Sequence, residues 1–297
     1  MLTGHESQIN PRIECFITFL TRSYQRLYPL TDSTYGDLAA DLGRRALYTL
    51  AKSTAAYHDL DHTLLVTSAG IDILRGKHLL EGSVTPRTWA HMIVAMCYHD
   101  IGFIRGASQD DWPGHYTTGL DHASITLPES ATDAALAPYH VDRGKHIMQE
   151  MITGYSDLDT DLIASYIERT RFPVPQDHAY APTDDPAGLV RAADLIGQLA
   201  DPKYLDKHPA LFQEFEETGT NAILGHTSPT DLRYAYPAFF RTCIQPYIEP
   251  AQLYLQLTPQ GQRWVNSLYG HVATVERELR AMAADGKSSA VQCPVAV

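Results

Sequence analysis

Two short segments of this chain carry side chains that can bind a metal ion. Residues 57–62 read Tyr-His-Asp-Leu-Asp-His, which places His58 and His62 four positions apart, and so on one face of a helix if the segment is helical. His99 and Asp100 form an adjacent pair at the end of an apolar run. Imidazole and carboxylate groups suit a borderline divalent cation and leave positions open for water and substrate. The two segments therefore predict a metal centre if the fold brings them together.

A later aspartate, Asp194, extends this pattern. It follows two alanines in the segment Arg-Ala-Ala-Asp-Leu-Ile-Gly. The order H…HD…D, over roughly residues 58–205, resembles the HD superfamily of metal-dependent phosphohydrolases. The resemblance implies that His62, His99, Asp100 and Asp194 hold one divalent ion, with Asp100 as the bridge if a second ion binds. It leaves the choice among Mn, Fe, Co, Ni, Zn and Mg open.

The residues around His58 resemble a more specific motif. Tyr57-His58-x-x-x-His62 is similar to the Tyr-His-Asn-x-x-His motif of the cyclic nucleotide phosphodiesterases, in which the first histidine protonates the leaving oxygen. The resemblance implies that His58 is a catalytic proton donor. Two positions depart from that pattern: Asp59 replaces the asparagine, and Phe103 replaces a histidine four positions after His99.

A further segment bears on a second metal site. His140 and Gly144 resemble the His-x-x-x-Gly helix that brings an additional ligand in binuclear members of the superfamily. Those members carry another histidine some thirty residues later, where this chain has Thr170. A second site would therefore be completed by His140, Asp100 and solvent or substrate, and would bind its ion more weakly than the first.

A phosphorylated substrate also needs local positive charge. Five basic residues lie between the His-Asp pair and Asp194: Arg143, Lys145, Arg169, Arg171 and Arg191. Arginine suits bidentate contact with phosphate. We expect Lys145 to act at the reacting phosphate and Arg143, Arg169 and Arg171 to bind the substrate.

Composition narrows the class of protein and of partner. The chain has 297 residues, 44% of them hydrophobic and 20% charged, which is ordinary for a soluble globular protein. Its net charge of −12, without a basic cluster, argues against nucleic acid polymers and favours a small phosphorylated molecule, such as a nucleotide. The four scattered cysteines and the absence of a signal peptide or membrane span predict a cytoplasmic protein. An oligomer is possible.

Helical periodicity dominates the chain, so we predict an all-α fold: an HD-domain helical bundle with additional N- and C-terminal helices. Residues 1–285 are expected to form one domain with its HD core at about 45–215, followed by a flexible tail at 286–297. The expected helices span 9–28, 34–52, 58–77, 86–100, 141–153, 156–171, 186–199 and 208–218, with two or three more over 231–284. Residues 102–138 break the pattern and are interpreted as a loop over the site that could act as a lid. The acidic run 214–217 is expected to be a solvated helix face.

These observations predict a metal-dependent phosphohydrolase of the phosphodiesterase or nucleotidase type. Two alternatives stay open. Some proteins with this fold hold two irons and use O₂, which would require the further histidine that Thr170 replaces. A non-catalytic regulatory module could also retain the site and bind metal and ligand without turnover.

Overall fold

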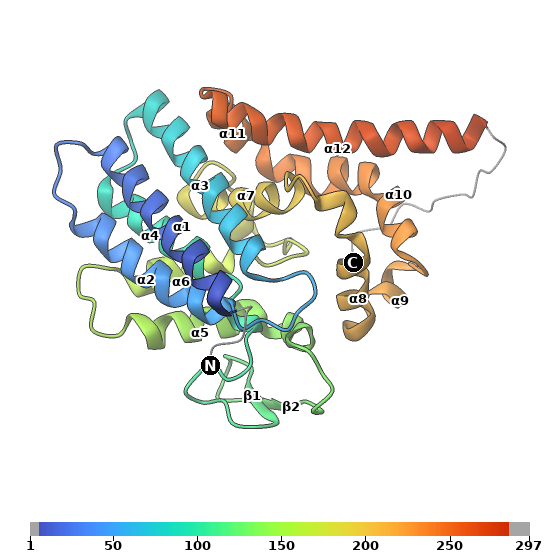
Figure 1. Cartoon of the computed structure of the whole chain (residues 1–297), viewed down its shortest axis with the longest axis horizontal. Coiled ribbons are helices and arrows are strands. Elements are labelled where there is room, and N and C mark those ends of the chain that lie inside the picture. The colour runs from blue at the N-terminus through green and yellow to red at the C-terminus, as the bar shows by residue number, and fades with distance from the viewer. Residues whose placement is uncertain (1–5, 285–297) are drawn as a thin grey trace.

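The computed structural model describes residues 6–284 and is built mainly from helices, which confirms the predicted all-α class (Figure 1). The helices before the His-Asp pair are α1 (Glu6–Leu27), α2 (Thr34–Leu50), α3 (Leu60–Glu81) and α4 (Pro86–Tyr98). The middle helices are α5 (His140–Ile152), α6 (Thr160–Glu168), α7 (Pro186–Leu199), α8 (His208–Thr218) and α9 (Thr220–Leu224). The last are α10 (Pro229–Phe239), α11 (Gln245–Leu255) and α12 (Pro259–Ala284), with a π-helical turn, η5, at Phe240–Ile244. The predicted tail at 286–297 lies outside the described residues.

The centre of the bundle is formed by α3, α4 and α7. Every residue of α4 from Trp89 to Tyr98 is buried, so this helix is surrounded by others. Helix α7 packs against α3, and Gly197 explains how closely, because a Cβ there would lie 2.5 Å from Val66 Cα. This contact brings the first turn of α3 beside the middle of α7, the two places from which the first and last predicted ligands extend.

The helices begin where local capping chemistry predicts. Asp59 caps α3 by accepting a hydrogen bond from the His62 backbone N–H at 3.1 Å. Thr85 caps α4, and Asp185 caps α7, each followed by a proline in the first turn. Helix α3 ends at Gly82, which has φ of 63° in the left-handed region that favours glycine. Since Asp59 is the cap, His58 lies just before α3. The predicted helix, which began at residue 58, had included it.

The segment 102–138 is more ordered than the sequence suggested. It contains a 3₁₀ turn at Ile101–Phe103 (η1), a two-stranded antiparallel hairpin of β1 (His115–Thr117) and β2 (Ser124–Thr126), and a 3₁₀ helix at Asp133–Tyr139 (η2). The hairpin lies at the edge of the bundle, beyond α5 and on the opposite side from α12 (Figure 1). Strands of three residues are too short to show alternation in the sequence, so no strand is predicted there. None of the helices in residues 6–284 is long and apolar enough to span a membrane.

Candidate metal centre

Four donor atoms from three parts of the fold converge at one point, three of them on buried residues and the fourth on the partly buried Asp194. His62 comes from α3, Asp194 from α7, and His99 and Asp100 directly follow α4. His62 Nε2 lies 3.3 Å from His99 Nε2, 3.1 Å from Asp100 Oδ2 and 3.3 Å from Asp194 Oδ1. His99 Nε2 lies 3.2 Å from Asp100 Oδ2 and 3.5 Å from Asp194 Oδ1. The structure thus brings together all four residues that the resemblance implied as ligands.

This group of atoms suits a divalent cation. Ligands about 2.1 Å from an ion, at tetrahedral or octahedral angles, lie roughly 3.0 to 3.4 Å apart, close to the spacings here. His99 Nδ1 donates to the Met96 carbonyl oxygen at 2.8 Å, which leaves the Nε2 lone pair for the centre. Asp100 Oδ2 is buried and no hydrogen bond is directed at it. An acceptor oxygen in that position is the expected partner of a cation.

The electrostatics of the centre point the same way. Burial opposes a charge on His62, but Asp100 and Asp194 outweigh it and raise the pKa of this imidazole to about 9. Burial acts to raise the pKa of Asp100, yet His99 and His62 hold it well below its usual range. Two carboxylates that each lie within 3.5 Å of the same two imidazoles require positive charge, which either protons on the imidazoles or a metal ion can supply. Metal binding should therefore release protons.

Backbone packing fixes the His-Asp pair in place. Gly102 follows the pair in η1, where a Cβ would lie 1.9 Å from the carbonyl oxygen of His140 and 2.6 Å from the backbone nitrogen of Gly144. Only a glycine permits this approach between the turn and the start of α5. The contact explains the His-x-x-x-Gly spacing as a packing requirement that also brings His140 next to the pair.

His58 is held by a residue that the sequence analysis missed. His58 Nδ1 lies 2.6 Å from Glu214 Oε2, and Glu214 Oε1 accepts from the backbone N–H groups of Tyr57 and His58 at 2.6 and 3.0 Å. Glu214 is 4% exposed, so the expected solvated face is wrong at this position. A usable signal was its spacing of three from Leu211, which places it on the buried side of α8.

This pairing prepares His58 to donate a proton. Burial works against the imidazolium, but the Glu214 carboxylate raises the pKa of His58 above its ordinary value. The side chain is 21% exposed and its ring lies 5.6 Å, between centroids, from that of His62. Since Nδ1 is engaged with Glu214, Nε2 is the atom that can deliver a proton beside the centre.

His140 lies next to the centre without joining the four donor atoms. Its Nδ1 donates to the Ala137 carbonyl oxygen at 2.6 Å, and burial lowers its pKa. Its ring stacks on Phe103 with centroids 4.6 Å apart. Among residues 6–284, the group of donor atoms that all lie within 4.8 Å of one another holds His62, His99 and Asp194; Asp100 joins it through its contacts with the two imidazoles, and no such contact is found for His140. Its role as a further ligand stays a prediction.

The cations expected to bind phosphate are engaged inside the protein. Arg143 is fully buried and donates to Asp111 and to the carbonyl oxygens of Gly102, Ile104 and Thr117. It anchors the hairpin segment to α5, so its assignment to substrate binding is corrected. A buried guanidinium with these partners cannot contact a substrate.

Three other cations keep carboxylate partners at the protein surface or just below it. Lys145 and Arg171 both contact Glu168 and Asp142, and Arg169 lies 3.0 Å from Asp185. Each would have to exchange a carboxylate for a substrate phosphate. Their roles at a substrate therefore stay predictions.

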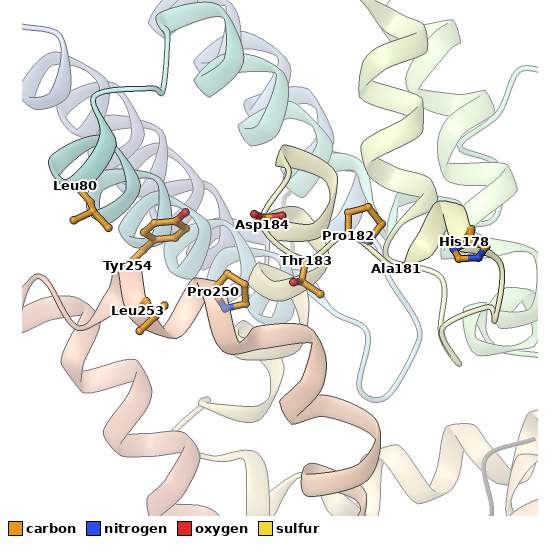
Figure 2. A pocket seen from close by; sticks show the side chains of 9 residues that line it. All are labelled: Leu80, His178, Ala181, Pro182, Thr183, Asp184, Pro250, Leu253 and Tyr254. Atoms are coloured by element: carbon orange, nitrogen blue, oxygen red, sulfur yellow. The ribbon is translucent and has the colours of Figure 1, made fainter.

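Two other features lie apart from this centre. A cavity of 660 Å³ is lined by three parts of the chain: the end of α3, the segment that precedes α7, and helix α11. Figure 2 shows Tyr254 and Thr183 among its lining side chains. None of the four metal-centre residues lines it. A more exposed group joins Asp110 to His146 and Glu150 of α5. Ser108 and Gln109 also donate to Glu150, so this group docks the hairpin segment on α5.

Comparison with known proteins places the chain in a family. A family model described as Npun_R2479-like matches residues 8–278. The chain belongs to this family. No curated protein matches it. Its fold is similar to the crystal structure of the phosphodiesterase domain of the RhoPDE fusion protein from the choanoflagellate Salpingoeca rosetta. That likeness has a TM-score of 0.56 at 13% identity and covers 91% of this chain and 93% of that one, so this Npun_R2479-like protein shares its fold.

Proposed function

We propose that this protein is a metal-dependent phosphoric ester hydrolase of the HD superfamily, of the phosphodiesterase or nucleotidase type. The observation that carries the proposal is the juxtaposition of two features. The Asp100 and Asp194 carboxylate oxygens each lie within 3.5 Å of both the His62 and His99 Nε2 atoms, and a carboxylate-held imidazole lies beside this group. The proposed substrate is a small phosphorylated molecule, specifically a nucleotide. The net charge of −12 disfavours a nucleic acid polymer.

The residues present divide the chemistry between them. His62, His99, Asp100 and Asp194 would hold the divalent ion, which when bound supplies Lewis acidity toward the phosphoryl group and a water of lowered pKa. His58 would protonate the leaving oxygen from Nε2, since Glu214 occupies Nδ1. Glu214 also orients the ring through the backbone of Tyr57 and His58, so the proton donor is fixed before substrate arrives.

A hydrolysis panel tests this function. Nucleotides and cyclic nucleotides would be offered to the protein with Mn²⁺, Co²⁺, Ni²⁺ or Mg²⁺, beside the variants Asp100→Asn and Asp161→Asn. Asp161 is exposed on α6, so its variant controls for the loss of one carboxylate elsewhere. We expect turnover of at least one substrate that is lost in Asp100→Asn and kept in Asp161→Asn.

Other outcomes would favour the alternatives. Two tightly held irons per chain after anaerobic purification, with O₂ consumption, would favour a di-iron oxygenase. Metal and nucleotide binding with no turnover under any condition would favour a regulatory module. Thr170, at the position of the further histidine, is buried and donates to the Ile167 carbonyl oxygen at 2.8 Å, so it brings no imidazole to a second iron.

A further inference from the structure

Phe103 occupies a position next to the metal centre that the proposed reaction does not use. It ends η1, the 3₁₀ turn after the His-Asp pair, and its backbone N–H donates to the Asp100 carbonyl oxygen at 3.0 Å. The side chain is 2% exposed and packs with Leu50 and Ile104. The ring therefore cannot change its rotamer without displacing its buried neighbours.

The phenyl ring lies between two histidines. The His58 ring stacks on it with centroids 4.5 Å apart and planes 12° apart. The His140 ring stacks on it with centroids 4.6 Å apart and planes 24° apart. These spacings are at the short end of the range for aromatic pairs, so neither water nor an ion fits between the rings. Three rings from three separate segments thus form one continuous stack.

This stack lies beside Asp100, the residue that a second ion would share. Burial is the largest influence on the pKa of both His58 and His140, and the Asp100 carboxylate also acts on both. Phe103 thus brings the stack next to the His-Asp pair, three residues after Asp100. A phenyl ring offers no lone pair to a metal. Because the Nδ1 atoms of His58 and His140 have partners, only their Nε2 atoms could face an ion, and that of His58 is the proposed proton donor.

We propose that Phe103 is a positioning residue that holds His58 and His140 in a stacked array and, three residues after Asp100, supplies no ligand to a second ion, so that the centre takes one metal ion. The proposal rests on the metal-holding part of the proposed function and not on the hydrolysis. It gives a physical reason for a single occupied site, and it assigns His140 to the stack, where its orientation depends on the phenyl ring.

The stacking is tested on the metal-free protein. The imidazole proton resonances of His58 and His140 would be compared by NMR in the native chain, Phe103→Leu, Phe103→Tyr and the control Phe16→Leu, a buried core position of α1. Ring current from a stacked phenyl shifts these protons upfield. We expect both histidines to move downfield in Phe103→Leu and to stay in place in Phe103→Tyr and Phe16→Leu. Unchanged shifts in a folded Phe103→Leu would overturn the stacking.

The stoichiometry is tested by equilibrium dialysis with Mn²⁺ alone. We expect one equivalent in the native chain and in Phe103→Tyr, and a second, weaker equivalent in Phe103→His, which adds an imidazole beside Asp100. Two equivalents in the native chain would overturn the proposal, and one equivalent in Phe103→His would overturn the assignment of the exclusion to Phe103.

These outcomes are distinct from failure of the proposed function. A native chain that binds Mn²⁺ but hydrolyses nothing removes the hydrolase and leaves the stoichiometry to be decided by dialysis. A native chain that binds no metal overturns both the hydrolase and the single-ion site, while the NMR comparison still decides the stack. In an active enzyme, Phe103→Leu should lower kcat about tenfold with little change in KM, and Phe103→Tyr should restore it.

Discussion

One carboxylate, Glu214, organises the approach to the metal centre. Its two oxygens divide their partners: Oε1 accepts from two backbone N–H groups, and Oε2 contacts His58 Nδ1. The same side chain therefore fixes the chain before α3 and the orientation of the imidazole. Glutamine in this position could keep the backbone contacts through its oxygen, but it would present an N–H group to the imidazole nitrogen.

We predict that Glu214→Gln lowers kcat by about 10- to 100-fold, the usual loss when a carboxylate that orients an imidazole is removed. KM should change little, because Glu214 contacts the proton donor and not the substrate. The measurement is steady-state hydrolysis of the best substrate from the panel, with Glu249→Gln, at an exposed position of α11, as the matched control. A kcat within twofold of the native value would show that His58 does not depend on this carboxylate.

At this scale, sequence reasoning reached residues that share a motif and missed those that do not. His62, His99 and Asp100 are anchored by local patterns, and the structure brings them together with Asp194. Glu214 lies 156 positions from His58 and belongs to no recognisable spacing with it. Arg143 shows the converse: its charge suggested a phosphate, and only the fold reveals that Asp111 neutralises it in the interior.

At the scale of secondary-structure elements, the bounds and packing of the helices explain why the predicted metal ligands meet. The bounds of α7 and α8 are those the sequence predicted, because a proline lies in the first turn of each helix and Asp185 caps α7. Helix α6 is shorter than predicted, since Asp159 caps it at Thr160. What no local pattern shows is the close backbone contact between η1 and α5 at Gly102, which depends on atoms forty residues away.

We predict that Gly102→Ala destabilises the protein by about 2 kcal/mol, because a Cβ 1.9 Å from the His140 carbonyl oxygen meets backbone that cannot move aside cheaply. Gly270→Ala is the matched control, since a Cβ there meets nothing within 4 Å. Within α12 it should stabilise by about 0.5 to 1 kcal/mol through helix propensity alone. Urea unfolding of both variants measures the two signs. A Gly102→Ala protein as stable as the native one would contradict this account of η1 and α5.

At the scale of the whole molecule, the C-terminal helices pack against the helices that carry the centre. Trp264 of α12 donates to Asp72 of α3 at 2.9 Å. His271, also on α12, lies 2.9 Å from the Leu199 carbonyl oxygen at the end of α7. In Figure 1, α12 runs along one side of the bundle, close to α11 and α10. The stability of this layer therefore bears directly on α3 and α7, and through them on His62 and Asp194.

His208, at the start of α8, makes this packing sensitive to acid. It is 3% exposed, its ring lies 4.9 Å from that of Tyr204 and 6.5 Å from that of Tyr236, and its Nε2 has no hydrogen-bond partner. Burial lowers the pKa of His208 from 6.5 to about 4; Arg233 and His271 also lower it, while the Leu205 carbonyl oxygen and Asp206 oppose this. The imidazole is thus neutral in the folded protein at pH values where the unfolded chain already binds a proton.

The sign of the pH dependence follows from this depressed pKa. Below pH 6.5 the unfolded state binds more protons at His208 than the folded state, so stability is lost as pH falls from 6.5 toward 4. Between pH 7 and pH 5 this single group should lower the free energy of unfolding by about 2 kcal/mol.

The measurement is the free energy of unfolding in urea at both pH values, for the native chain, His208→Asn and the exposed control His178→Asn. The loss on acidification should be about 2 kcal/mol smaller in His208→Asn, because asparagine does not titrate. Equal losses in all three proteins would mean that His208 is protonated without strain, and that the contact of α8 with α10 does not depend on its neutral form.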